Sequence, residues 1–212
     1  MNYITFDLEW NTPITRYRDV QNGVKLQGEI VQIGAVKTTA DLTVLDTFSA
    51  LVKPQVYHKM LKDITELTDI TDAMLADARP FTEVLPEFLA WCRAGGAAGI
   101  NDAAGNNDAA GNNDAAGEGY VFCSWGPNDI LYLEDNMRYY GLEIDGLPEC
   151  YDMQVVFDDQ ITQDGRDYAL SYAMWKLDIH PNRSHDALND ALNTVEVMRH
   201  FDLSDGLDGY EV

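Results

Sequence analysis

The chain has 212 residues, with 36 acidic and 14 basic side chains, a formal net charge of −22 and 46% hydrophobic residues. This length and composition are typical of one folded domain and exclude a wholly disordered, collagen-like or membrane-embedded chain. Residues 1–10 lack the features of a signal peptide, and the three cysteines form no CxxC pair. We therefore expect a reducing, cytoplasmic location and no membrane partner. The negative charge disfavours stable binding of long duplexes in a basic groove.

Three strands are predicted in the first quarter of the chain. Residues 1–10, 29–37 and 43–53 each have the apolar and β-branched content of a strand. Asn22-Gly23 marks a turn between the first two of these strands. The chain is therefore expected to begin with a strand meander.

Helices and strands are predicted to alternate in the rest of the chain. From Phe81 onward, apolar residues recur at the spacing of one helical face, and the apolar run at 120–125 predicts a buried central strand. Pro127 suits the first turn of a helix that ends near Tyr140. Further elements are expected at 149–153 (strand), 167–177 (helix) and 186–201 (helix). This order predicts an α/β fold with a mixed central sheet flanked by helices.

Residues 97–118 interrupt the pattern with a six-residue repeat rich in Ala, Gly, Asn and Asp. The repeat lacks the apolar residue that each coil of a β-helix would bury, and it has no Glu to clamp a calcium ion. We predict a flexible loop, dispensable for chemistry, inserted into a single domain that spans residues 1–212.

Three acidic residues stand at positions that favour a site. Asp7 and Glu9 are two residues apart on the first predicted strand, so their carboxylates share one face. Carboxylates facing a core are costly unless they bind a cation, although an edge strand with a polar outer face is an alternative. Asp129 follows the strand at 120–125, where sites in α/β folds form. Acidic residues are also common there because they complement the helix dipole.

His185 and Asp190 are five residues apart, at the start of the last predicted helix. On one helix they would differ by roughly 140° in direction, so they converge only if His185 lies on the preceding loop. The alternative is a capping or surface histidine. Four carboxylates suit Mg²⁺ or Mn²⁺ rather than zinc, and with one histidine they match a two-metal phosphodiesterase.

Three segments carry a family resemblance: FDLEW (6–10), SWGPND (124–129) and HDALNDA (185–191). In order and spacing they resemble the three motifs of the DEDDh 3′–5′ exonuclease superfamily. Apart from 97–118, the chain resembles its KapD-like bacterial branch, which is related to exonucleases that trim histone mRNA and small RNA ends. The resemblance implies a ribonuclease-H-like fold and a metal-dependent 3′–5′ exonuclease. Its expected partner is a single-stranded nucleic-acid 3′ end, RNA more than DNA, and its product is nucleoside 5′-monophosphates.

The resemblance also implies roles for the acidic residues and the histidine. Asp7, Glu9, Asp129 and Asp190 would hold two divalent ions, Mg²⁺ or Mn²⁺, with Asp7 bridging them. His185 would act as the general base on the attacking water. Three alternatives stay open: an oligoribonuclease-like scavenger of very short oligonucleotides, a non-catalytic regulatory module of a signalling pathway, and an acidic metal-binding protein without catalysis.

Substrate contacts follow from the same resemblance. The positions expected to bind the terminal nucleotide are Leu8, Trp10, Leu67 and Thr68. Core packing is the alternative role for Trp10. Two residues depart from the family pattern: Asp69 stands where Gly is usual, and Asp186 stands where a small, polar or basic residue is usual. Both carboxylates disfavour tight binding of long strands.

Overall fold

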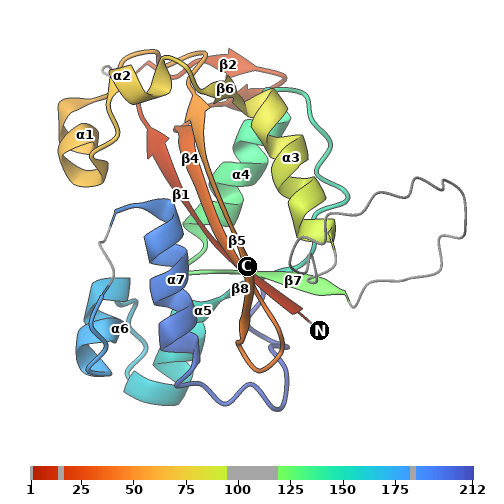
Figure 1. Cartoon of the computed structure of the whole chain (residues 1–212), viewed down its shortest axis with the longest axis vertical. Helices are drawn as coiled ribbons and strands as arrows, with labels where there is room; N and C mark the ends of the chain where they lie inside the picture. The colour runs from red at the N-terminus through yellow and green to blue at the C-terminus, as the bar shows by residue number, and fades with distance from the viewer. Residues whose placement is uncertain (1, 14–16, 95–118, 182–184) are drawn as a thin grey trace, which may run out of the picture.

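A mixed six-stranded sheet forms the centre of the molecule (Figure 1). The computed structural model describes residues 2–13, 17–94, 119–181 and 185–212. The strand order is β6-β5-β4-β1-β7-β8. Strand β1 is antiparallel to β4 and parallel to β7, so the predicted mixed sheet is confirmed. The strands are β1 (Asn2–Asn11), β4 (Glu29–Thr38), β5 (Val44–Lys53), β6 (Arg79–Pro80), β7 (Tyr120–Ser124) and β8 (Cys150–Asp152).

Helices cover both faces of this sheet (Figure 1). Helix α7 (Ala187–Met198) packs on β1 and β4 from one side. Helices α3 (Phe81–Arg93) and α4 (Asn128–Tyr139) share a core with the opposite face. The remaining helices are α1 (Lys62–Thr68), α2 (Asp72–Leu75), α5 (Met153–Phe157), a π-helical turn (Asp158–Thr162) and α6 (Leu170–Lys176). Among the described residues, no helix combines the length and apolar content needed to span a membrane.

The alternation of side chains along β1 decides which residues reach the site. The even-numbered residues from Ile4 to Leu8 are buried in the core beneath α3 and α4. On the other face, Thr5 is buried and its hydroxyl contacts the sulfur of Met198 on α7. Because successive side chains of a strand point to opposite faces, Asp7 continues this second series. The predicted carboxylate pair therefore faces α7.

A close backbone contact holds α7 on the sheet. A Cβ atom on Gly34 of β4 would lie 2.1 Å from the backbone nitrogen of Leu188 and 2.2 Å from the carbonyl carbon of Ala187. Any side chain at Gly34 would therefore push the first turn of α7 away from β4. This contact holds the start of α7 against β4. Strand β4 in turn pairs with β1, which carries Asp7 and Glu9.

The predicted elements are found, with one correction. The Asn22-Gly23 turn joins a separate hairpin of β2 (Val20–Gln21) and β3 (Val24–Lys25), instead of linking the first two sheet strands directly. Both turn residues have positive φ, 51° and 77°, which suits a two-residue hairpin turn. The repeat at 97–118 lies outside the described residues.

Candidate active site

One cleft of about 320 Å³ brings together every residue that the sequence pointed to. Four of these predicted residues lie on β1 and two on α1. The other three lie on α4, on α7 and on the loop before α7. These residues are Asp7, Leu8, Glu9, Trp10, Leu67, Thr68, Asp129, His185 and Asp190. No Lys or Arg is among the described residues that line the cleft.

Three further lining residues were missed by sequence reasoning. They are Ile64, Trp125 and Asn128. Trp125 and Asn128 lie inside the segment SWGPND, and Ile64 lies one helical turn before Leu67, so neighbouring positions on the same motifs were the available signal. Their side chains add an apolar wall and one amide to the acidic floor of the cleft.

Asp7 and Glu9 are half-buried acids without donors: among the described residues, none donates a hydrogen bond to either carboxylate. Burial raises the pKa of Asp7 well above its ordinary value, and the Asp129 and Glu9 carboxylates raise it further. Burial, followed by the charges of Asp190, Asp129 and Asp186, raises the pKa of Glu9 to about 8. These two acids therefore carry an electrostatic cost that the described residues around them do not compensate.

Asp129 connects α4 to β1. It lies in the first turn of α4, as predicted, and is 5% exposed. Its Oδ1 accepts the backbone N–H of Leu8 at 2.9 Å, which fixes the carboxylate beside the carboxylate pair of β1. Burial raises its pKa to about 7, although the Leu8 N–H opposes this shift. The buried hydrogen bond thus decides the orientation of the carboxylate without neutralising it.

His185 lies on the loop before α7, where it can meet Asp190. Its φ of 61° places it in the left-handed region, and its backbone N–H donates to Asp190 Oδ2 at 2.7 Å. Asn193 Nδ2 donates to the other carboxylate oxygen at 3.3 Å. One potential ligand atom from each of Glu9, His185 and Asp190 lies within 4.8 Å of the others. The loop position required for His185 is therefore confirmed.

Asp186 has a structural role at the N-terminus of α7. Its Oδ1 accepts the N–H of Asn189 at 3.1 Å and caps α7. Its Oδ2 accepts Gln32 Nε2 at 3.1 Å, and Gln32 Oε1 accepts the N–H of Ala187 at 3.2 Å. Gln32 pairs with Glu9 in the β1–β4 register, so this clamp fixes the start of α7 opposite the carboxylates. These hydrogen bonds give Asp186 a structural function at a position where the family pattern has a small, polar or basic residue.

The donor set fits a divalent cation. Asp7, Glu9, Asp129 and Asp190 all have raised pKa values, and burial is the largest cause in each case. Clustered carboxylates are the ligands that Mg²⁺ and Mn²⁺ prefer, and a bound cation would remove the repulsion between them. Because no Lys or Arg is among the described residues that line the cleft, a metal ion could supply the counter-charge to these carboxylates.

The rim of the cleft offers apolar surface to a ligand. Leu67 on α1 is 51% exposed although it is a large aliphatic residue. Trp10 stacks on Tyr132 with ring centroids 4.2 Å apart, so one face of its indole is packed while its free side borders the cleft. Thr68 is buried, and its hydroxyl donates to the carbonyl of Ile64 at 2.9 Å. A substrate contact from Thr68 would therefore involve its methyl group or backbone.

Asp69 ends α1 in the left-handed conformation. Its φ is 60° and its backbone N–H donates to the carbonyl of Thr65. Glycine adopts this conformation with least strain, which explains why the resemblance expects Gly at this position. The family pattern has glycine, and therefore no side chain, at this position. Here the residue that ends α1 carries a carboxylate next to Thr68, which lines the cleft.

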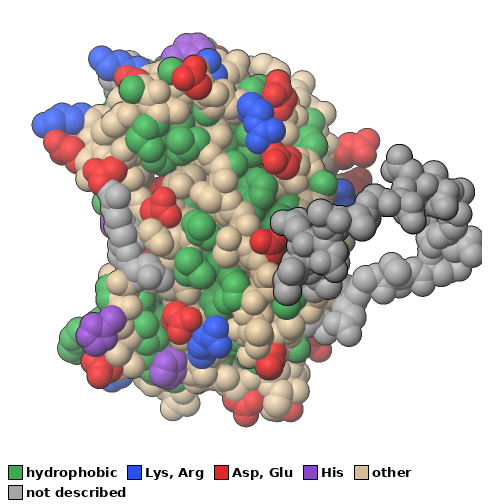
Figure 2. Space-filling model, viewed as in Figure 1, with side chains coloured by type: hydrophobic (Ala, Val, Ile, Leu, Met, Phe, Trp, Pro, Cys, Tyr) green, Lys and Arg blue, Asp and Glu red, His purple; other side chains and the backbone are tan. Residues whose placement is uncertain are grey.

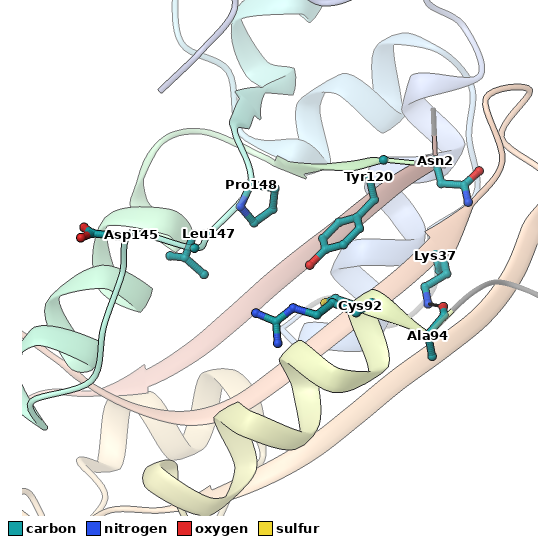
Figure 3. Close-up of a pocket in the computed structure, with 11 residues that line it drawn as sticks. Asn2, Lys37, Cys92, Ala94, Tyr120, Asp145, Leu147 and Pro148 are labelled. Carbon is teal, nitrogen blue, oxygen red and sulfur yellow. Dashed lines mark hydrogen bonds between the residues drawn. The ribbon is translucent and has the colours of Figure 1, made fainter. Parts of the chain in front are cut away.

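A second cavity, of about 600 Å³, does not share this chemistry (Figure 3). It lies near Asn2, at the opposite end of β1 from the carboxylates, and Tyr120 projects into it from β7. The Lys37 ammonium is occupied by hydrogen bonds to the carbonyls of Trp91 and Ala94. The pKa of the buried Cys92 thiol is raised to about 12, so it is a poor nucleophile. Volume alone therefore does not identify the site.

Comparisons with known proteins agree with this geometry. The exonuclease family model RNase_T matches residues 6–103. Residues 6–103, which include Asp7 and Glu9, are therefore similar to an exonuclease-family domain. A DNA polymerase III PolC-type protein of Thermotoga petrophila is 30% identical over 173 residues, which cover 82% of this chain. One from Caldanaerobacter subterraneus is 35% identical over 91 residues, which cover 43% of this chain. The chain spans 10% and 6% of the lengths of these two relatives.

Solved structures show that the fold is the ribonuclease-H-like exonuclease fold. The nuclease domain of 3′hExo, a DEDDh family member bound to rAMP, matches with a TM-score of 0.76 at 17% identity and covers 100% of this chain and 96% of that chain. A 3′-exonuclease solved in 3′-end-specific recognition of the histone mRNA stem-loop matches with a TM-score of 0.74 at 17% identity, covering 98% and 83%. Exonuclease X in complex with 5′ overhanging duplex DNA matches at 0.56 and 16% identity, covering 97% and 98%.

Proposed function

We propose that the protein is a metal-dependent 3′–5′ exonuclease that hydrolyses the terminal phosphodiester bond of single-stranded nucleic acid and releases nucleoside 5′-monophosphates. The observation that carries this proposal is the convergence of four carboxylates and one histidine around a single cleft of an exonuclease-family domain. These residues come from separate segments of the chain, and β1, α4 and α7 bring them together.

The chain's own residues have distinct tasks in this reaction. Asp7, Glu9, Asp129 and Asp190 would hold Mg²⁺ or Mn²⁺, which supplies an activated water and neutralises developing negative charge when bound. His185 is exposed at the rim, and its backbone N–H holds the residue beside Asp190, where the imidazole would accept a proton from the attacking water. Asn193 and the Leu8 N–H orient the carboxylates of Asp190 and Asp129.

The walls of the cleft favour a nucleotide at a strand end. Ile64, Leu67 and Trp10 present apolar surface on which a terminal base can stack or pack. The cleft has acidic and apolar walls with no described cation to hold a run of phosphates, which favours short single-stranded ends over long duplex. The bound rAMP and the histone mRNA named for two similar structures support RNA as the first substrate to test.

The experiment is a time course with 5′-labelled single-stranded RNA and a DNA strand of matched sequence, in Mn²⁺ or Mg²⁺. We expect a ladder that shortens from the 3′ end, inhibition by EDTA, and loss of the ladder in His185→Ala. His200→Ala is the matched control, because His200 is an exposed histidine at the end of α7, outside the cleft. Thin-layer chromatography of the products identifies 5′-monophosphates.

Three outcomes would contradict parts of the proposal. Cleavage that is unchanged in His185→Ala would refute the assignment of the general base. A folded protein that binds Mn²⁺ but cleaves neither strand would instead support the non-catalytic regulatory module. Activity restricted to oligonucleotides of two to five residues would favour the oligoribonuclease-like alternative.

A further inference from the structure

A row of aromatic side chains leads from the cleft to the outer surface of α6. Trp125 lines the cleft, and its ring centroid lies 5.7 Å from that of Phe157. Phe157 lies 6.3 Å from Tyr168, which stacks on Tyr172 at 4.1 Å with an interplanar angle of 14°. Tyr172 lies 5.6 Å from Trp175. We call these five residues the aromatic row.

The aromatic row ends at an open hollow of about 250 Å³. Trp175, Met174 and Ile179 provide apolar walls, and Asp178 and His180 provide polar groups beside them. Figure 2 shows hydrophobic side chains and a histidine gathered at the surface over α6, at the lower left. The hollow thus offers one aromatic face and several hydrogen-bonding groups, which suits a planar heterocycle.

Core packing explains only the inner part of the aromatic row. Phe157 is fully buried, and Trp125 donates its indole N–H to the carbonyl of Tyr168 at 2.9 Å. Trp175, in contrast, is 72% exposed. Tryptophan contributes most to stability when buried, so an indole at this exposure adds little to the fold. Its position beside a hollow, at the end of a series of ring contacts that begins at the cleft, leaves the indole available to a ligand.

We propose that Trp175, supported by Tyr168 and Tyr172 of the outer row, binds in its hollow a base of the substrate strand upstream of the 3′-terminal nucleotide. This inference rests on the proposed exonuclease function and extends it from the terminal nucleotide to the strand behind it. Every nucleobase has a face that stacks on an aromatic ring, so such binding tolerates any sequence. Because Tyr168 and Tyr172 pack on each other at 4.1 Å and Tyr172 contacts Trp175 at 5.6 Å, the inner rings support the exposed indole of Trp175, which offers the ring face to a base.

The charges around α6 require binding through bases instead of phosphates. The exposed Arg166 and Lys176 flank the outer row, but the exposed Asp164, Asp167 and Asp178 lie on the same stretch of chain. The formal charge of −22 on the whole chain disfavours phosphate contacts as the main source of affinity. We therefore expect strand binding that changes little with salt, unlike binding in a basic groove.

The test compares two substrate lengths in three variants. For a single-stranded oligonucleotide of about ten residues, Trp175→Ala should raise KM by about 5- to 100-fold, as expected from losing one base–aromatic stack. Its kcat/KM for a dinucleotide should stay unchanged, because the hollow shares no described lining residue with the cleft that holds the terminal nucleotide. Trp175→Phe should restore most of the affinity for the longer strand. Val20→Ala is the control, since Val20 is 61% exposed on β2, far from α6 in Figure 1.

Binding measured without catalysis separates this inference from the proposed function. Fluorescence anisotropy of a 5′-fluorescein ten-residue strand in EDTA should show weaker binding to Trp175→Ala than to the wild type, with little change between 50 and 300 mM NaCl. Equal affinity of the two proteins, or an equal loss for dinucleotide and ten-residue substrates, would overturn the role of the aromatic row. Wild-type protein that binds the strand through Trp175 but never cleaves it would overturn the exonuclease function alone.

Discussion

Two glutamates on neighbouring strands show how the same side chain serves structure in one place and chemistry in another. Glu29 begins β4 and is 1% exposed. Its carboxylate accepts backbone N–H groups from Gln55, Val56 and Tyr57, and the hydroxyl of Tyr140. It therefore ties the segment after β5 and the end of α4 to the sheet, with its charge solvated by protein donors.

Glu9 on the paired strand β1 has the opposite environment. No described residue donates a hydrogen bond to its carboxylate, and its neighbours are other carboxylates, including Asp190. Its pKa is raised to about 8, first by burial and then by those charges. A buried carboxylate that the protein satisfies stabilises the fold, whereas one left unsatisfied among others marks the place where a cation or substrate must complete the structure.

The largest expected effect is the loss of activity in Glu9→Gln. The amide keeps the size of the side chain but removes one negative ligand from the cleft, so cleavage should fall below detection in the 3′-end ladder assay. In EDTA the same variant should melt at a higher temperature than the wild type at pH 8, because repulsion among carboxylates is relieved. Differential scanning calorimetry measures this gain. A Glu9→Gln variant that is less stable than the wild type in EDTA would show that the Glu9 carboxylate, like that of Glu29, stabilises the fold.

The next effect is on the chemical step. His185→Ala should lower kcat by about 10²–10⁴-fold, the usual contribution of a general base. Metal binding measured by isothermal titration calorimetry should persist, because the contact of residue 185 with Asp190 is made by the backbone N–H. His200→Ala should match the wild type in both measurements. Loss of Mn²⁺ binding in His185→Ala would show that the imidazole acts as a ligand.

Replacing Glu29 should affect stability and leave chemistry intact. Glu29→Ala leaves several buried donors without an acceptor, so the free energy of unfolding should fall by about 3 kcal/mol or more. Urea denaturation measures this change. Single-turnover cleavage by the fraction that is folded should remain near the wild-type rate. A large loss of kcat in fully folded Glu29→Ala would contradict the assignment of a structural role to Glu29 and a chemical role to Glu9.

The pH dependence of stability should differ with and without metal. The pKa of Glu9 is raised from 4.5 to about 8 and that of Asp129 to about 7, so protonated carboxyl groups favour the folded state at low pH. This contribution is complete below their ordinary pKa values and is lost as the pH rises through the raised values. In EDTA the Tm should therefore decline between pH 5 and 8.5. Mn²⁺ should raise the Tm more at pH 8.5 than at pH 5, because protons compete for the same oxygens.

The smallest effect concerns the clamp at the start of α7. Asp186→Ala removes the helix cap and the Gln32 contact, so the free energy of unfolding should fall by about 1 kcal/mol. Asp186→Asn can keep the cap and should lose less. Chemical denaturation of the two variants side by side measures the difference. Equal stability of the alanine and asparagine variants would show that capping is not the role of Asp186.

Much of the site could be predicted from local spacing. Two carboxylates two residues apart on a strand must share a face, and the five-residue separation of His185 and Asp190 required the histidine to leave the helix. The structure confirms the position of His185 on the loop and places Asp7 and Glu9 in the same cleft. The assignments of catalytic role stay predictions, because they depend on ligands and rates.

The sequence by itself predicted the main sheet strands, the longer helices, the candidate carboxylates and the exonuclease resemblance, because these depend on periodicity and spacing within short segments. Only the tertiary structure decided which acid is an anchor and which belongs to the cleft: Glu29 and Glu9 look alike in sequence, and their donors come from segments distant in the chain. The same holds for the aromatic row, which joins Trp125 to Trp175 across separate elements. Solvation of a buried charge and stacking of rings are properties of neighbours in space, which sequence order does not contain.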